Sequence, residues 1–267
     1  MSSAEIARMQ AAAAVIDEIR ARLADDPGGL LAMVAAGAQA LNDWQHYPAG
    51  DVYDPRSHAQ YFFHAHSPAQ RSPCEYGHFH TFLRAEGMPV GVAPLVLPET
   101  AVADASPATP QAAPLKRGRR DEVSHLIAIS VNARGEPIRL FTTNRWVTGE
   151  TWYRGEDVIR MLDRFTIEAA DGPPLLNRWV GAVVALFRPQ VAGLLRLRDE
   201  TVMGWRRRRR ANVFEDTRLE ITSSFDVDLD AQIAFLHQPR ARPGSPVTGR
   251  SARLTQTADG WGEGPPY

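Results

Sequence analysis

The sequence predicts an α+β fold, in which an antiparallel sheet of about five strands is flanked by an N-terminal helical hairpin and C-terminal helices. Apolar residues recur at three- and four-residue steps near the N-terminus, short aromatic and β-branched runs fill the middle, and the helical period returns after Trp152. Because helices both precede and follow the strands, we expect residues 1–237 to form one domain. Its flexible inserted loop lies at about 98–121, and 238–267 form a disordered tail.

Two helices are expected before the strands. The first runs from Ala4 to Leu23 and ends at the Asp-Asp-Pro-Gly-Gly sequence that follows. The second runs from about Leu30 to Trp44. Their short connection favours antiparallel packing of the two helices, which is the expected helical hairpin.

The expected strands are rich in aromatic and β-branched residues. They lie at Tyr61–His66, His78–Arg84, Pro89–Leu97, His125–Asn132 and Ile138–Thr143, with a further short strand at Leu219–Phe225. Proline, alanine, serine and threonine dominate the flexible loop at 98–121, which ends in a basic run. The later helices are expected at Val158–Phe165, Leu175–Phe187, Val191–Trp205 and Leu229–His237.

Composition and motifs exclude several classes. The formal net charge is −1, so no global field attracts nucleic acid or an anionic membrane. No apolar run approaches the ~20 residues of a membrane span, and the only cysteine, Cys74, cannot form an internal disulfide, which favours the cytoplasm. The sequence lacks a phosphate loop, a dinucleotide fingerprint, a nucleophile elbow and a His-Glu-x-x-His helix. These absences disfavour the kinase, dehydrogenase and hydrolase classes that those motifs mark.

Two His-x-His pairs carry the clearest chemical signal. His64 and His66 form one pair, His78 and His80 form the other, and eleven residues lie between the two pairs. Residues two apart on a strand point to the same face, so each pair presents two imidazoles side by side. If the two strands are antiparallel neighbours, both pairs lie on one face, with opposed Cβ atoms ~4.5–5.5 Å apart. The pattern therefore predicts a metal site.

Further candidate ligands lie near the pairs. Glu75 precedes His78 by three residues and is expected to act either as a ligand or as the base that accepts a proton from metal-bound water. His125 begins a strand of the same sheet and is a fifth candidate imidazole ligand. Imidazoles with a carboxylate and open positions suit iron or zinc, which indicates a metal-dependent oxygenase or hydrolase acting on a small molecule.

The first pair followed by Glu75 resembles one element of the cupin pattern, a His-x-His followed by Glu. The chain departs from that pattern at two places. The gap between His66 and Glu75 is longer, and the second pair replaces the later single histidine of the family.

Three alternatives stay open. The histidines can be structural, in a non-catalytic binding or scaffold protein; they can also serve acid–base chemistry without a metal.

Arg145 lies between polar and aromatic residues and is a candidate to bind an anionic substrate, although a structural ion pair is the competing interpretation. The run Arg206–Arg210 reads as a solvated helix end, and together with Lys116–Arg120 it is the weaker alternative of an anion-binding surface.

Overall fold

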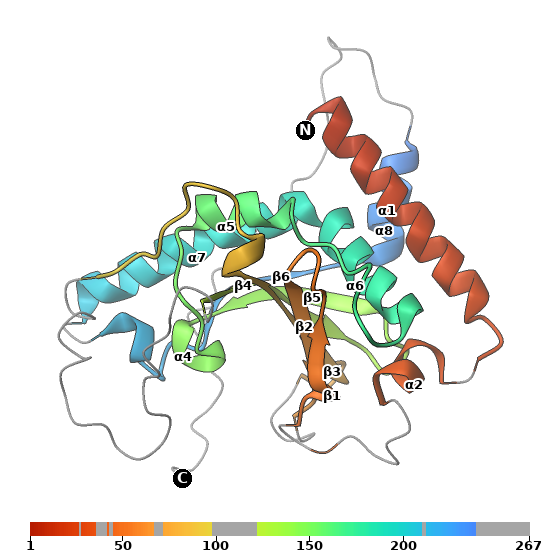
Figure 1. Ribbon diagram of the computed structural model, residues 1–267, viewed down its shortest axis with the longest axis horizontal. Helices are drawn as coiled ribbons and strands as arrows, with labels where there is room; N and C mark the ends of the chain where they lie inside the picture. The colour runs from red at the N-terminus through yellow and green to blue at the C-terminus, as the bar shows by residue number, and fades with distance from the viewer. Residues whose placement is uncertain are drawn as a thin grey trace.

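The structure is a computed structural model that describes residues 1–26, 28–35, 42, 45–66, 72–97, 122–209 and 212–238. It confirms the α+β class: helices flank an antiparallel sheet, which has six strands where about five were expected (Figure 1). The expected flexible loop at 98–121 and the expected disordered tail from 239 onward lie outside the described residues. The assignment of 1–237 to one domain stays a prediction.

The sheet is a meander, because each strand pairs antiparallel with the next one in the chain. Its strands are β1 (Tyr47–Tyr53), β2 (Ala59–His64), β3 (Gly77–Arg84), β4 (Val123–Val131), β5 (Pro137–Thr143) and β6 (Ile221–Asp226). Sequential hairpins of this kind bring segments that are close in sequence side by side, so β2 and β3 are direct neighbours.

Two strand predictions need correction. β1 lies where no strand was expected from the sequence, because Pro48 and Gly50 obscure its alternation. The strand expected at Pro89–Leu97 is wrong: this segment has no ladder and runs as irregular chain after the 3₁₀ helix Ala85–Gly87. Proline nitrogens at two of its positions cannot donate to a ladder, and Val90 is almost fully exposed.

The helices are α1 (Ser3–Arg22), α2 (Gly29–Ala35), α4 (Arg145–Thr148), α5 (Gly155–Leu162), α6 (Pro174–Leu186), α7 (Arg188–Arg208) and α8 (Leu229–His237). A capping box between Ser2 and Glu5 begins α1. The main helix partner of α1 is α6, with α8 beside it, rather than the α2 of the expected hairpin (Figure 1). The apolar stripe of α1 therefore packs on α6 and α8.

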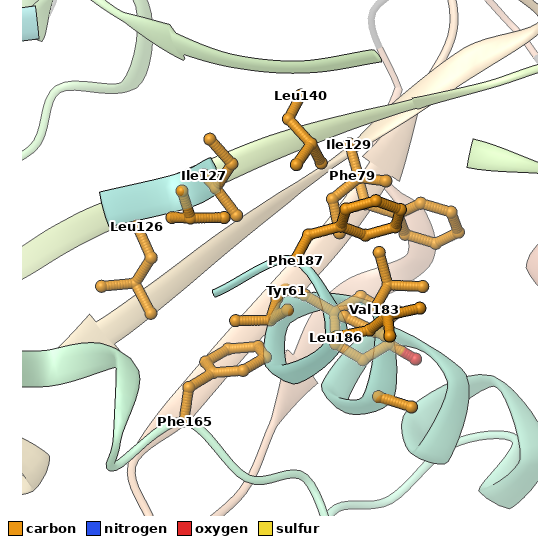
Figure 2. Close-up of a cluster of buried hydrophobic side chains, with 14 of the residues drawn as sticks. Tyr61, Phe79, Leu126, Ile127, Ile129, Leu140, Phe165, Val183, Leu186 and Phe187 are labelled. Carbon is orange, nitrogen blue, oxygen red and sulfur yellow. The ribbon is translucent and has the colours of Figure 1, made fainter. Parts of the chain in front are cut away.

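One face of the sheet forms the main core. Its side chains meet the helical layer, as Figure 2 shows for Tyr61, Phe79, Ile129 and Leu140 against α6 and the residues that follow it. The Tyr61 hydroxyl donates to Asn177 of α6 at 2.7 Å. Burial of these large apolar groups contributes about 25 cal/mol per Å² and so fixes which face of each strand points inward.

The opposite face carries the histidines. Alternation along β2 and β3 places Phe62 and His64, and likewise His78 and His80, on the side away from the main core. The short helix α4 lies over part of this face (Figure 1). Asn144 caps α4, and its side chain also donates to the carbonyl of Val213 at 2.7 Å. This hydrogen bond connects the start of α4 to the segment that follows α7.

The long C-terminal helices meet at a sharp bend. α6 and α7 are inclined by 69° at Phe187, next to Pro189 in the first turn of α7. No single helix among the described residues is both long enough and apolar enough to cross a membrane, and α6 and α7 meet both conditions only when they are counted together across the bend. α7 ends at Arg208 with exposed arginines, as expected for a solvated helix end; Arg210 lies outside the described residues.

Candidate metal centre

His64 and His78 are cross-strand partners in the β2–β3 ladder. Their Nε2 atoms approach to 2.7 Å, and the rings meet nearly edge to face. The neighbouring pair in the same ladder is Phe62 with His80, so His80 lies diagonally across from His64. The predicted convergence of the two His-x-His pairs is therefore found.

Three of these imidazoles form a group of metal-ligand size. Ring nitrogens of His64, His78 and His80 all lie within 4.8 Å of one another. A zinc–imidazole bond is ~2.0–2.1 Å long, so small side-chain rotations suffice to bring three such nitrogens around one ion. The Nε2 of His66 lies 3.2 Å from that of His64, which places a fourth imidazole at the edge of the group.

Glu75 stands behind His78 and fixes its tautomer. One carboxylate oxygen lies 2.6 Å from Nδ1 of His78, and the other accepts a hydrogen bond from Ser130 at 3.2 Å. A carboxylate can only accept, so Nδ1 carries the proton and Nε2 keeps its lone pair. This is the carboxylate–histidine arrangement that orients metal-bound imidazoles in proteins.

His125 stands behind His80 in a similar way. Its Nε2 lies 3.0 Å from Nδ1 of His80, and its backbone N–H donates to buried Glu150 at 2.7 Å. A bulge between Thr81 and Phe82 of β3 brings His125 of β4 opposite Phe82 and so onto this face. The sequence predicted His125 as a direct ligand; the structure brings it against the ligand group through His80.

Burial favours the neutral form of His64, His80 and His125. It lowers the pKa of His64 to about 2, with neighbouring imidazoles adding to the shift, and it lowers the pKa of His80 well below its ordinary value. Burial also lowers the pKa of His125 to about 3, with Arg198 adding to the effect. Burial acts to raise the pKa of Glu75, but the hydrogen bond and charge of His78, together with Ser130 and Arg139, outweigh it and hold that pKa below its ordinary value. Neutral imidazoles beside one carboxylate are the protonation states in which these groups bind a cation.

A cavity of about 350 Å³ opens beside the histidines. Its floor is the histidine face of the sheet, and its roof is α4. Apolar side chains form much of the wall: Phe62, Phe141, Trp146, Val147 and Ile221. The indole N–H of Trp146 donates to the carbonyl of Leu219 at 2.9 Å, which orients that ring. A cavity of this size is at the small end of the range for ligand sites in proteins.

His46, just before β1, is a site residue outside the ligand set predicted from the sequence. Its ring stacks on Phe62 at 3.6 Å between centroids, and it lines the cavity. Asp51 binds Nδ1 of His46 at 2.9 Å from a left-handed backbone position (φ 59°), and Gln60 donates to the other oxygen of Asp51 at 2.6 Å. Only the recognition of β1 as a strand could have placed His46 beside the pairs.

The arginine on the cavity is Arg139 rather than Arg145. Arg145 forms an ion pair with Glu215, in line with the structural alternative, and it is not part of the cavity wall. Arg139 shares the histidine face because it lies opposite Ser130, which is itself opposite His78. Its alternation with Phe141 and Thr143 along β5 is the sequence signal that could have identified it.

The comparisons with known proteins bear on the chain as a whole. No curated protein and no solved structure matches it. One family model does match, over residues 9–227, a span that includes the whole sheet, the histidine group and the helical layer. The chain therefore belongs to the family described as a domain of unknown function, DUF6969.

Proposed function

We propose that this protein is a metal-dependent enzyme that acts on a small molecule in the cytoplasm, with iron(II) or zinc as its metal. The observation that carries the proposal is the buried group of His64, His78 and His80 beside a cavity of ligand size. Three neutral imidazoles leave coordination positions open, which is typical of catalytic rather than structural sites.

The residues around the group have distinct roles in this proposal. His64, His78 and His80 bind the ion, and His66 is the fourth imidazole available to it. Glu75 orients His78, and His125 orients His80. A metal at this position supplies Lewis acidity toward a substrate or water.

Proton transfer needs a group that reaches the cavity without being held in the ligand shell. His46 meets this condition, since Asp51 holds one nitrogen and the ring lines the cavity. Glu75 is the second candidate: it lines the cavity, but both of its oxygens are engaged by His78 and Ser130. We therefore assign acid–base work to His46 first and to Glu75 second.

Elemental analysis tests the proposal directly. The purified chain is loaded anaerobically with iron(II) or with zinc, desalted and measured by mass spectrometry. We expect about one ion per chain for the wild type, and a large loss for the double variant H64N/H78N. The variant His237→Asn is the matched control, because His237 is an exposed residue of α8. Less than about a tenth of an equivalent of either metal in the folded wild type removes the proposal.

A second candidate function rests on the hydrogen bonds within the group. His64 bonds to His78 and His80 bonds to His125, so these imidazoles already satisfy part of one another's hydrogen-bonding capacity. In a non-catalytic binding or scaffold protein they would serve stability alone. The variants His64→Asn and His78→Gln would then lower the melting temperature of a chain that retains no metal before or after substitution.

A further inference from the structure

The cavity next to the histidines has a cationic end. Arg139 is the one arginine or lysine among the described residues that line it. The Nε atom of Arg139 pairs with Asp226 at 3.1 Å, but Asp226 is highly exposed at the rim, so this ion pair is weak and solvent-screened. The guanidinium has further N–H donors in a planar fork, which matches the two oxygens of a carboxylate.

Thr143 supplies a second, independent observation. Its side chain is only 2% exposed and lines the same cavity. Among the described residues, its Oγ1 has no hydrogen-bond partner. A buried hydroxyl without a partner costs about 1–3 kcal/mol, so such groups in native proteins mark a place where a ligand or water binds. Thr143 and Arg139 lie on the same face of β5, two alternations apart.

The remaining wall is apolar and aromatic. Phe62 of β2 contacts the ring of His80, Phe141 of β5 contacts the ring of His78, and Trp146 of α4 closes the cavity from above. A ligand held at Arg139 therefore places its body against aromatic rings. The cavity volume of about 350 Å³ restricts that body to a small one.

Charge decides between kinds of anion. Glu75 and Glu220 each bring one negative charge to the wall and Arg139 brings one positive charge, with the imidazoles counted as neutral. A divalent ion at the histidines leaves a net charge of +1. A carboxylate neutralises this charge, whereas a phosphate dianion would leave an excess of negative charge in a partly buried space.

We propose that the cavity binds a small carboxylate with an apolar body, whose carboxylate is held by Arg139 while its body lies against Phe141 and Trp146 and extends along β5 toward Thr143. This proposal rests on the proposed function in one respect: the carboxylate is a substrate only if a metal binds at the histidines beside its body. The carboxylate site itself consists of residues outside the ligand group, so its dependence on Arg139 can be tested in metal-free protein, where the missing positive charge of the ion is expected to weaken carboxylate binding without abolishing it.

Calorimetry of the full chain with benzoate as probe tests the proposal, with benzamide as the uncharged isostere. Each is titrated into metal-free protein and into zinc-loaded protein, and metal content is measured separately. We expect benzoate to bind more tightly than benzamide, and the variant Arg139→Gln to weaken benzoate binding by about tenfold or more while benzamide is unaffected. Thr143→Val is expected to weaken benzoate binding by a smaller factor.

Two matched variants separate binding from folding. Arg145→Gln removes an arginine outside the cavity and is expected to leave benzoate binding unchanged. Asp226→Asn frees Arg139 from its rim partner and is expected to preserve or tighten binding. Equal binding of benzoate and benzamide, or equal benzoate binding by wild type and a folded Arg139→Gln protein, overturns the proposal. If benzoate binding depends on Arg139 but no metal binds, the carboxylate site stands and the proposed function fails.

Discussion

The carboxylate of Glu75 lies 2.6 Å from Nδ1 of His78, while Nε2 of the same ring lies 2.7 Å from Nε2 of His64. The proton on Nδ1 leaves His78 as the acceptor in its contact with His64, so His64 donates through Nε2 when no cation is present. If a metal ion were bound here, it would take the place of that proton, and His64 would carry its proton on Nδ1 instead. Glu75 thus orients the ring of His78 from outside the group formed by His64, His78 and His80.

The first prediction concerns this carboxylate. Glu75→Gln keeps the shape of the side chain but removes its charge and the strong hydrogen bond that orients His78. We expect metal affinity to fall about 10–100-fold, as for other carboxylates behind metal-bound histidines. A competition titration with a zinc-binding dye measures the effect. Glu136→Gln, in the Asn132–Pro137 turn, is the control and should leave zinc affinity unchanged; an equal loss in both variants would contradict the role of Glu75.

The second prediction concerns pH. His64, His80 and His125 have folded-state pKa values far below their unfolded values, so the unfolded chain binds more protons as pH falls below about 6.5. The free energy of unfolding is therefore expected to decrease as pH falls through this range, by about 1.4 kcal/mol per pH unit for each imidazole. Urea denaturation of metal-free protein between pH 7 and 5 measures the slope.

Glu150 acts in the opposite direction and gives this prediction its control. Burial raises its pKa to about 7, against the opposing attraction of Arg198, so the folded state binds an extra proton between about pH 7 and 4.5. This proton uptake offsets the loss of stability caused by roughly one of the three imidazoles. The variant Glu150→Gln is expected to have a steeper loss of stability on acidification than wild type. A slope that is unchanged or shallower in this variant would show that Glu150 does not titrate as proposed.

A third prediction tests the close approach of β2 and β3. A Cβ atom on Gly77 would lie 2.3 Å from Cζ of Phe63 and 2.7 Å from the carbonyl oxygen of His64. Gly77→Ala must therefore separate the strands next to His78, and we expect a loss of about 1–3 kcal/mol in stability together with weaker metal binding. Gly181→Ala in α6 is the matched control, since nothing lies within 4 Å of its added methyl group. That variant should be neutral or more stable by up to ~1 kcal/mol in urea denaturation.

The fourth prediction concerns Arg198 of α7, which is 1% exposed. Its guanidinium stacks over Trp152 at 4.2 Å and donates to the carbonyl of Tyr153 and to Asp199. Lysine lacks the planar fork, so Arg198→Lys is expected to lower the free energy of unfolding by about 3 kcal/mol. Arg196→Lys, in an exposed ion pair two residues earlier, should change it by less than about 1 kcal/mol. Similar losses in both variants would contradict a special role for the buried guanidinium.

The local patterns predicted a large part of the fold. The periodicity of α1, α6 and α7 and the alternation of β2 to β6 are local properties, and each is visible in a short window of sequence. β1 and the segment at Pro89–Leu97 were misjudged because proline and glycine break the alternation in both, while only tertiary pairing decides which of the two joins the sheet.

By itself the sequence determined that His78 and His80 lie on a shared face of their strand, because side chains alternate with a period of two. His66 lies beyond the end of β2, so only the structure places it beside His64. The hairpin between the two His-x-His pairs made their strands neighbours. Only the tertiary structure decided the register that opposes His64 to His78, and it alone brought His46 and Arg139 to the cavity. Those contacts depend on how distant strands pair and how α4 covers the sheet, and such packing is a sum of many weak long-range interactions that no single segment encodes.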